Sequence, residues 1–419
     1  MLIEFSASNY RSIRERQTLS MVAAPRLGKK QNVLEHGLDE KFPNLLKAAV
    51  IYGPNASGKS ALVSAMGILP MIIGRGPEYF GRHLPISPFR FDASLTAEPS
   101  FFEIHFIQQG LRYQYEVAMT VERIVEEKLV VYPKGREQLL FHRYSSSKTV
   151  GEKYEFGPIF EGGTELRNAW VNLTGPRVLF LGQAVRNSNE SLTQLRLPYD
   201  WIAAMYPMQK DSLSEWAESS EELVGDHEEF CDELAEFLRT VDVPVSEIRV
   251  EKFTAPMRNS KTKNSAFEEE SETQRTIYTH TTDLGSAEFD SYEESDGTRN
   301  LIGFWLPYSI MIDRVKPSFK LLIVDELDSS LHPSIVSALV SRHMNSGGNG
   351  QLIFTTHDTR LMKENILRRD QFWVTERDSN GATQLRSIHD FSGREGEDVE
   401  KRYFEGRYRG LPILPRGME

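Results

Sequence analysis

Apolar and polar side chains alternate at period two in several stretches of the first part of the chain. Residues 2–20 contain two such runs joined by Asn9-Tyr10-Arg11-Ser12, which predicts two strands and a turn. Runs at 100–107 and 113–119 flank Gln109-Gly110, a dipeptide typical of a hairpin turn. The pattern continues through 127–144, so we expect a meander of antiparallel strands here.

Other apolar runs are continuous rather than alternating. They occupy 46–52, 177–183, 319–324 and 351–354, and the second of them ends at a polar amide, Gln183. Short continuous runs are typical of strands that a parallel sheet buries on both faces. The sequence therefore predicts an α/β fold with a central, mainly parallel sheet and an antiparallel β subdomain.

Helical periodicity follows the first continuous run, over 61–69, and recurs over 200–240 and 301–311. Residues 257–276 carry almost no apolar side chains, and we expect them to form a mobile loop or the tip of a long hairpin. These patterns indicate three consecutive regions: an N-terminal lobe over 1–195, a helical insertion with the loop or hairpin over 196–290, and a C-terminal lobe over 291–419.

A phosphate-binding motif lies between the strand predicted at 46–52 and the helix after it. Its sequence, Gly53-Pro54-Asn55-Ala56-Ser57-Gly58-Lys59-Ser60, fits the pattern G-x-x-x-x-G-K-S. Its glycines let backbone N–H groups surround phosphate oxygens, and the helix N-terminus adds partial positive charge. We expect Lys59 to neutralise the β- and γ-phosphates and Ser60 to bind Mg²⁺. The residues expected to contact the nucleotide here are Gly53, Asn55, Ala56, Ser57, Gly58, Lys59 and Ser60.

Two later runs end in residues suited to hydrolysis. The run at 319–324 is followed by Asp325 and Glu326. Asp325 can hold the Mg²⁺ shell, while Glu326 can act as general base on the attacking water. The run at 351–354 leads to His357, whose imidazole can hydrogen-bond the γ-phosphate.

A second anion-binding end is predicted at the start of the helix over 301–311. Ser295 and Gly297 precede this helix, and serine and glycine at a helix N-terminus leave backbone N–H groups available to an anion. A turn over 327–333 directly follows the two carboxylates. These two stretches are distinct from the phosphate loop.

The amino-acid composition indicates the class of protein and the cellular compartment. The 419 residues are 26% charged and 39% hydrophobic with a formal net charge of −11, the balance of a globular protein. No run is long enough to span a bilayer, and the N-terminus lacks a signal pattern. The single cysteine, Cys231, excludes an internal disulfide and fits a reducing compartment. We expect a cytoplasmic protein with no membrane contact, on which a local basic groove could still bind nucleic acid.

Taken in order, these motifs resemble the ABC-type ATPase heads of SMC, RecF and OLD proteins. The resemblance implies that ATP is the ligand, with Lys59 and Ser60 as the Walker A pair, Asp325 and Glu326 as Walker B, and His357 as the switch histidine. It also implies that Gln183 is the Q-loop residue beside Mg²⁺, that Ser295 and Gly297 form the signature loop, and that Ser330 and Leu331 form the D-loop. Two residues depart from the pattern: His332 stands where many relatives carry aspartate, and the signature reads Ser-Asp-Gly-Thr-Arg.

A narrower resemblance is to the bacterial RloA/AbiL-type ATPases, which are associated with phage defence and are commonly encoded beside an effector gene. It rests on residues 5–13, 295–298, 325–333, 355–359 and 368–371. In ABC-type heads the signature loop of one subunit completes the nucleotide site of another. We therefore expect a homodimer or a higher even-numbered homo-oligomer with composite ATP sites. The separate effector would be a nuclease or a toxin from an adjacent gene.

Three other function classes compete with this interpretation. The main alternative is a DNA-repair or chromosome-associated ATPase that clamps nucleic acid, because the C-terminal run of basic residues at 401–409 alternates with aromatic ones. Packing of this run on its own domain is the commoner outcome. A transporter ATPase is disfavoured because the insertions do not suit docking to membrane subunits. A nuclease domain of usual size does not fit into the roughly sixty residues after His357.

Overall fold

The computed structural model describes residues 1–38, 42–75, 77–81, 83–145, 151–189, 193–209, 212–227, 229–256, 270–312, 319–393 and 397–411. They belong to two compact units. The first unit combines Met1–Met208, Met311–Leu327 and His343–Glu419, and the second combines Gln209–Ile310 with Asp328–Arg342. The three regions predicted from the sequence follow one another along the chain, whereas these units interleave.

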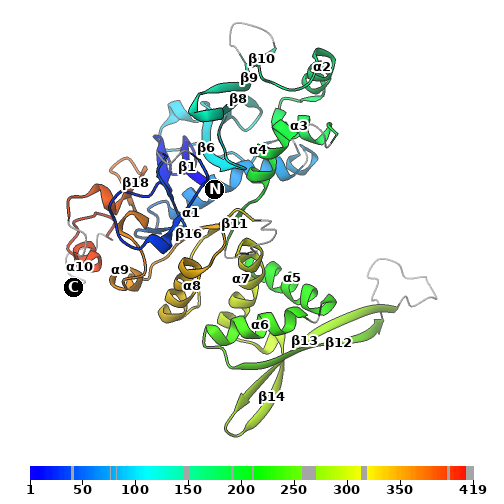
Figure 1. Ribbon diagram of the computed structural model, residues 1–419, viewed down its shortest axis with the longest axis vertical. Coiled ribbons are helices and arrows are strands. Elements are labelled where there is room, and N and C mark those ends of the chain that lie inside the picture. The colour runs from blue at the N-terminus through cyan, green and yellow to red at the C-terminus, as the bar shows by residue number, and fades with distance from the viewer. Residues whose placement is uncertain are drawn as a thin grey trace. The chain divides into compact units, whose positions relative to one another are not determined.

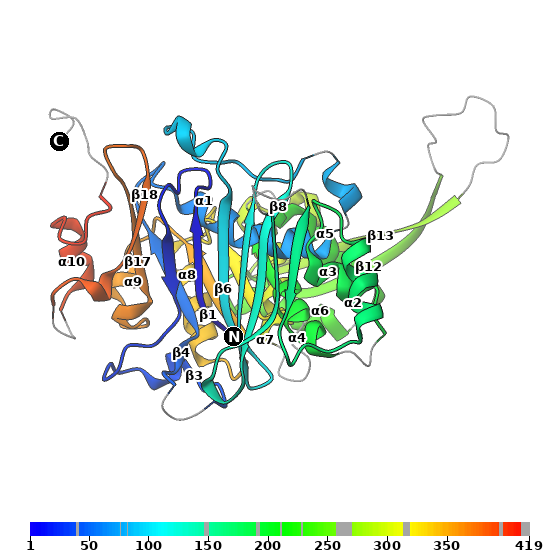
Figure 2. The same cartoon turned by 90° about the horizontal axis from the view of Figure 1, so that it is seen from above.

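The first unit contains a seven-stranded antiparallel sheet with the strand order β10-β9-β8-β7-β6-β1-β2. Figure 2 shows β1, β6 and β8 running alongside one another. The predicted N-terminal pair and the meander are therefore confirmed, including the turn at Gln109-Gly110, where both residues have positive φ. The strands are β1 Leu2–Ser8, β2 Gln17–Ser20, β6 Ser100–Gln108, β7 Leu111–Met119, β8 Ile124–Tyr132, β9 Gln138–Ser145 and β10 Glu152–Phe156.

A second sheet of this unit has the order β11-β15-β16-β5-β17-β18, and only β18 runs antiparallel to its neighbour. The predicted mainly parallel sheet is confirmed. Its strands are β5 Ala48–Tyr52, β11 Met205–Met208, β15 Leu321–Val324, β16 Gln351–Thr355, β17 Phe372–Arg377 and β18 Thr383–Ser387. Strand β11 lies inside a stretch that the sequence predicts as helical. A short pair, β3 Val33–Leu34 and β4 Leu45–Leu46, completes the strands of this unit.

Helix α1 (Lys59–Gly74) joins the two sheets into one core. Nearly all of its residues are buried, and its apolar side chains share a single hydrophobic cluster with residues of both sheets. This packing fixes the start of α1 against the carboxyl end of β5. The other helices of the unit are α2 Thr164–Leu173, α3 Phe180–Arg186, α4 Thr193–Ala203, α9 Arg360–Lys363 and α10 Val399–Phe404. Short 3₁₀ helices are η1 Lys30–Asn32, η2 Pro77–Phe80, η3 Ala93–Leu95, η4 Pro133–Gly135, η6 Arg369–Gln371 and η7 Ile388–Asp390.

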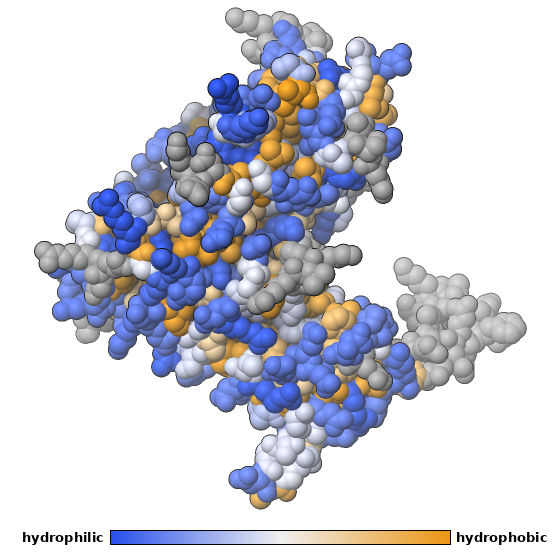
Figure 3. All heavy atoms as spheres, in the orientation of Figure 1, coloured by the Kyte–Doolittle hydropathy of each residue, from blue (hydrophilic) through white to orange (hydrophobic). Residues whose placement is uncertain are grey.

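The second unit packs helices against a three-stranded sheet with the order β12-β13-β14 (Figure 1). The predicted loop or hairpin tip lies mostly at 257–269, outside the described residues, but β12 and β13 on either side of it pair antiparallel as the arms of a hairpin. Hydrophilic side chains cover much of the surface over α5 and α6 (Figure 3). The elements are α5 Ser212–Asp226, α6 Glu229–Thr240, β12 Val245–Pro256, β13 Glu270–Thr282, β14 Gly285–Asp290, η5 Ser291–Glu293, α7 Asp296–Ile312 and α8 Pro333–Asn345.

Candidate functional site

The phosphate loop, residues 53–60, connects β5 to α1 as the sequence predicts. Gly53, Ala56 and Gly58 all have positive φ, at 151°, 61° and 104°. Repeated left-handed residues turn successive backbone N–H groups toward the inside of a loop, which is the geometry of an anion-binding nest. Ala56 adopts this conformation without being glycine, and such strain is found where surrounding structure enforces it.

The C-terminal hairpin β17–β18 holds this loop from outside. The hydroxyl groups of Ser57 and Thr375 are 2.6 Å apart, and both side chains are buried. A Cβ at Gly53 would lie 2.3 Å from Thr375 Oγ1, and one at Gly58 would lie 1.9 Å from Thr383 Oγ1. Both positions therefore require glycine for reasons of space as well as of φ.

The Lys59 side chain folds back over the loop. Its Nζ donates to the carbonyl oxygens of Gly53 at 2.8 Å and Pro54 at 3.2 Å, and the residue is 6% exposed. The ammonium group therefore lies at the phosphate loop itself, where a triphosphate would offer it charged oxygens. Ser60, the next residue, is exposed.

The carboxylates and the histidine follow the two strands beside β5. In the order β15-β16-β5 all three strands are parallel, and Val324 pairs with Phe354 while Thr355 pairs with Ile51. Their carboxyl ends therefore lie at one edge of the sheet. Asp325 and Glu326 follow β15, His357 follows β16 by two residues, and the phosphate loop follows β5. The sheet thus gathers the predicted Walker A, Walker B and switch residues in the first unit.

Gln183 does not follow a strand of this sheet, and the predicted strand over 177–183 is wrong. The residue lies in α3, whose Arg186 side chain donates to the Ile73 carbonyl at 3.0 Å. Ile73 belongs to the last turn of α1, and Lys59 to its first. At 1.5 Å per residue these two positions are about 21 Å apart, so α3 packs at the end of α1 that is remote from the phosphate loop.

The glutamine that sequence reasoning missed is Gln209. It directly follows β11, the neighbour of β15 in the sheet, and the Asp325 N–H donates to the carbonyl of Met208, the last residue of β11, at 3.0 Å. The available signal was the short run Met205-Tyr206-Pro207-Met208 before a glutamine. Four residues between two helical patterns are too few for periodicity to reveal a strand.

The signature stretch and the turn after the carboxylates lie against each other in the second unit. Ser295 Oγ accepts from the Thr298 N–H at 3.1 Å and so caps α7. A Cβ at Gly297 would lie 2.8 Å from the Ser330 carbonyl oxygen, and Asn300 Nδ2 donates to the Ser329 carbonyl at 3.1 Å. The two predicted motifs therefore form one continuous surface.

His332, which departs from the ABC pattern, has a local role in this turn. Its Nδ1 accepts from the Ser334 N–H at 3.3 Å, and the next residue, Pro333, begins α8. Histidine therefore accepts a hydrogen bond at the start of α8, at the position where the resemblance to ABC-type heads implies an aspartate. Pro333 at the first helical position suits the same helix start.

The C-terminal basic and aromatic run packs on its own unit, so the interpretation as a stacking surface for nucleic acid loses its support. Tyr403 and Tyr408 are buried, and Tyr403 packs near Tyr52, the last residue of β5. Three arginines are engaged in ion pairs: Arg402 with Glu397, Arg407 with Glu405, and Arg409 with Glu376. Phe404 remains exposed.

A cavity of about 470 Å³ is lined in part by residues that lie within two positions of Ser12, Thr375 and Thr383, and these three pack on or beside the phosphate loop. Its lining includes Arg14, the exposed ring of Phe91, and Gly381. Arg14 lies two residues after Ser12, and Gly381 two before Thr383, while Thr383 Oγ1 donates to Ser12 Oγ at 2.8 Å beside Gly58. The Arg377 guanidinium stacks over the Phe91 ring at 5.5 Å. The cavity therefore offers an aromatic and cationic wall near the loop.

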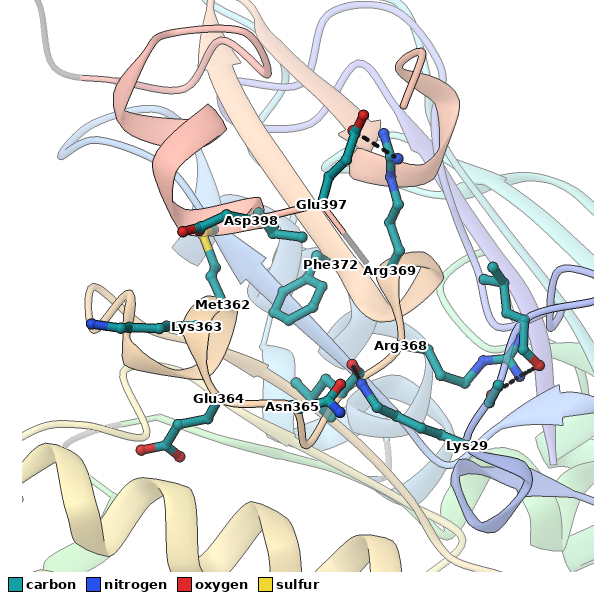
Figure 4. Close-up of a pocket in the computed structure, with 14 residues that line it drawn as sticks. Lys29, Met362, Lys363, Glu364, Asn365, Arg368, Arg369, Phe372, Glu397 and Asp398 are labelled. Carbon is teal, nitrogen blue, oxygen red and sulfur yellow. Dashed lines mark hydrogen bonds and ion pairs between the residues drawn. The ribbon is translucent and has the colours of Figure 1, made fainter. Parts of the chain in front are cut away.

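A different cavity, of about 640 Å³, lies between α9, η6 and the segment at 397–399 (Figure 4). Its arginines are already bonded. Arg368 pairs with Asp370 at 2.7 Å and donates to the carbonyl groups of residues 24, 27 and 28. Arg369 donates to the carbonyl groups of Ile388 and Phe391. These contacts join segments distant in sequence, and we read this cavity as a structural junction rather than a nucleotide site.

The residues at the sheet edge fit a nucleotide-bound Mg²⁺ better than a metal held by the protein alone. Across the described parts of the chain, no three histidine, cysteine or carboxylate groups gather to hold a metal. Mg²⁺ is commonly bound through one or two protein oxygens together with phosphate oxygens and water. Asp325 and Ser60 can supply such protein oxygens.

None of the described helices is both long and apolar enough to cross a membrane. The sequence matches no curated protein significantly. Among solved structures, the SMC head domain from Thermotoga maritima is similar with a TM-score of 0.42 and 12% identity, covering 92% of this chain and 98% of that one. An SMC head bound to the C-terminal winged-helix domain of ScpA has a TM-score of 0.45 and 12% identity, covering 96% and 99%. A RecF–ATP structure has a TM-score of 0.38 and 14% identity, covering 92% and 97%.

A family model described as "AAA domain, putative AbiEii toxin, Type IV TA system" matches residues 48–363. That range is well over half of the chain and extends from β5 to α9, so it includes the phosphate loop, the signature stretch, the carboxylate pair and the histidine. With the α/β sheet order and the phosphate loop between β5 and α1, the match establishes that the chain belongs to this family of P-loop ATPases.

Proposed function

We propose that this protein binds and hydrolyses ATP and acts as a nucleotide-gated regulator in a bacterial defence system with a separate effector. The observation that carries the proposal is the common edge of β5, β15 and β16. Lys59 and Ser60, Asp325 and Glu326, and His357 all follow these strands, and this is the set of groups that phosphoryl transfer to water requires.

Each residue has a separate task in the proposed reaction. The phosphate loop and Lys59 bind the β- and γ-phosphates, and Ser60 with Asp325 would hold Mg²⁺, which neutralises charge on the phosphates when bound. Glu326 accepts a proton from the attacking water. His357 donates a hydrogen bond to the γ-phosphate. Gln209 replaces Gln183 as our candidate for the glutamine near the metal, because it follows β11 directly.

The cavity lined by Arg14, Phe91, Arg377 and Gly381 is our candidate binding site for the nucleobase. A base has a flat π face that stacks on aromatic side chains and on guanidinium planes. Phe91 and Arg377 already form such a stack at the wall of the cavity. The Phe91 ring, which is 72% exposed, would then be covered in part by the base rather than by water.

A second copy of the chain completes the proposed site. Gly297 and Asn300, near the start of α7, contact the turn at 329–330, and Ser295 caps the same helix. A partner's triphosphate would therefore meet the N-terminus of α7 and this turn together, and the partial positive charge of the helix end favours the anion. Two chains arranged head-to-tail would enclose two ATP molecules.

The defence role rests on the family description, which names a toxin of a toxin–antitoxin system, and on the resemblance to RloA/AbiL-type ATPases. The resemblance supports a partner protein encoded nearby, a nuclease or toxin that the ATP-bound state holds or releases. Nucleic acid binding has no residue-level support from the C-terminal run. Salt-dependent binding of DNA by the ATP-bound protein would favour a clamp instead.

One experiment tests the proposal at its centre. Glu326→Gln keeps the size of the side chain but removes the base, so it should bind ATP–Mg²⁺, fail to hydrolyse it and remain a dimer in light scattering. Lys59→Ala should bind no ATP and stay monomeric. Hydrolysis by Glu326→Gln at the wild-type rate would show that the base is assigned wrongly. Co-purification of the adjacent gene product tests the regulatory part.

A further inference from the structure

A fully buried hydroxyl group lies between the strand that carries the histidine and the pair of carboxylates. Thr355 is the last residue of β16 and has no exposed surface. Its Oγ1 lies 2.7 Å from Asp325 Oδ1 and 2.8 Å from the Glu326 backbone nitrogen. Its carbonyl oxygen accepts from the Leu327 N–H at 3.0 Å. One residue thus contacts three successive residues after β15.

The chemistry of these groups fixes the direction of each hydrogen bond. A backbone N–H only donates, so the Thr355 oxygen accepts from Glu326. Its own proton then goes to Asp325 Oδ1, because an ionised carboxylate only accepts. Hydrogen bonds to ionised groups are the stronger kind. Asp325 Oδ1 is therefore held toward β16, and Oδ2 is left to bind a metal.

The hydrogen bond from the Glu326 N–H to the Thr355 hydroxyl restrains the backbone of Glu326. Glu326 has φ of 55°, in the left-handed region that is unfavourable for a residue other than glycine. Such a conformation persists only where neighbouring structure enforces it. The Thr355 hydroxyl and carbonyl hold the N–H groups on both sides of the Glu326 side chain, so they determine the direction in which its carboxylate leaves the backbone.

The rest of β16 shows that the hydroxyl is not needed for packing. Residues 352–354 of the strand are the apolar and buried Leu, Ile and Phe, and valine has the same branched shape as threonine. Burial of a hydroxyl is unfavourable unless it is hydrogen-bonded. A strand that needed only to fill the core would therefore favour valine at 355.

We infer that Thr355 is a positioning residue that orients both carboxylates, Asp325 toward the metal and Glu326 toward the water. This inference rests on the proposed ATPase function. It adds a residue to the site that touches neither nucleotide nor metal, and it explains how two adjacent carboxylates take different directions from one strand end.

The test compares Thr355→Val, Thr355→Ser and Thr356→Val. Thr356 is the matched control, because it is an equally buried neighbour whose hydroxyl accepts from the Asp358 N–H at 3.0 Å instead of contacting the carboxylates. Calorimetry measures ATP affinity in MgCl₂ and in EDTA, and phosphate release gives kcat. A thermal melt records whether each variant is folded, and Thr355→Ala repeats the test with a smaller side chain that also lacks the hydroxyl.

Thr355→Val should keep the wild-type ATP affinity in EDTA within about twofold. The gain in affinity that Mg²⁺ provides should fall by about tenfold, as for other residues that orient a metal ligand. The kcat should fall by about 10- to 100-fold, because small displacements of reacting groups have effects of this size. Thr355→Ser should recover both quantities to within about threefold, and Thr356→Val should keep both.

Three results would overturn the inference: a wild-type Mg²⁺ effect and kcat in folded Thr355→Val, an equal loss in Thr355→Ser, or an equal loss in Thr356→Val. Failure of the ATPase proposal looks different, because the wild type itself would then release no phosphate. The Mg²⁺ effect on nucleotide binding would still decide the role of Thr355 in that case.

Discussion

The contact between Ser57 and Thr375 gives a quantitative prediction for the phosphate loop. Thr375 Oγ1 lies 2.6 Å from Ser57 Oγ and donates to the Tyr52 carbonyl at 3.1 Å. Thr375→Val preserves shape but leaves the buried Ser57 hydroxyl without this partner, which costs about 2 kcal/mol. Ser57→Ala removes one hydrogen bond and leaves Thr375 bonded to Tyr52, so it costs about 1 kcal/mol.

The double variant, Ser57→Ala with Thr375→Val, tests whether the two hydroxyl groups interact. It lacks both hydroxyls, so no unsatisfied hydroxyl remains at this contact, and we expect about 2 kcal/mol rather than the additive value of about 3 kcal/mol. Without the hydroxyl contact the phosphate loop is less ordered, and ATP binding must then restore that order. The Kd for ATP in Thr375→Val therefore rises by up to about 30-fold, since 1.4 kcal/mol corresponds to a factor of ten. The same relation gives a coupling of about fivefold in Kd.

Calorimetric titration of the wild type, both single variants and the double variant with ATP–Mg²⁺ measures this cycle. Thr276→Val, at a buried threonine of the second unit, is the control and should leave ATP affinity unchanged. Additive effects of the two substitutions would refute the reasoning, because they would mean that the hydroxyl contact does not order the loop. Unchanged affinity in Thr375→Val would refute it equally.

Three further predictions concern other parts of the first unit and its boundary. Phe91→Ala should raise the Kd for ATP about tenfold, which is the size of a base-stacking contribution. Tripolyphosphate has no base, so its Kd should not change. Equal effects on both ligands would show that the base does not bind in this cavity. Gln209→Ala should slow phosphate release about tenfold and Gln183→Ala should not; the reverse result would restore Gln183. Burial lowers the pKa of His343 to about 4, so its neutral form stabilises the fold fully above pH 6.5, and this stability is lost as the pH falls toward 4. Between pH 7.5 and 5.5 the free energy of unfolding should drop by about 1.4 kcal/mol in urea titrations, and His343→Gln should lack that part of the pH dependence.

The sequence predicts this fold well where the pattern of apolar and polar residues repeats clearly over many residues. The meander from β6 to β8 alternates over nine-residue strands, and the strands before the phosphate loop and the carboxylates are continuous apolar runs. The motif residues could be found for the same reason, because each follows such a run. A common edge then follows where such strands are parallel neighbours in one sheet, since parallel neighbouring strands end together.

Two failures have one physical cause. The stretch at 177–183, predicted as a strand, contributes its residues from Phe180 onward to α3, and the short stretch at 205–208 forms β11. Both are too short for their pattern to decide between helix and strand, so tertiary contacts decide. Strand β11 forms because the edge of β15 offers it hydrogen bonds from residue 205 to residue 208. Nothing local in these four residues carries that information.

The sheet alone also leaves undetermined the part of the site that matters most for its chemistry. Backbone pairing ends at Thr355, Val324 and Tyr52, and the functional residues all lie just beyond, where no backbone ladder sets their directions. Beyond these strand ends, hydrogen bonds of threonine hydroxyl groups fix the positions of the loops. Thr355 bonds Asp325 and Glu326, Thr375 bonds Ser57, and Thr383 bonds Ser12 beside Gly58. Each of these threonines is buried and could be replaced by valine without loss of shape. If the hydroxyls position the site, each valine variant should lose nucleotide affinity or turnover by a larger factor than its loss of stability accounts for. A loss that only follows stability would mean that the strand ends hold their loops by packing alone.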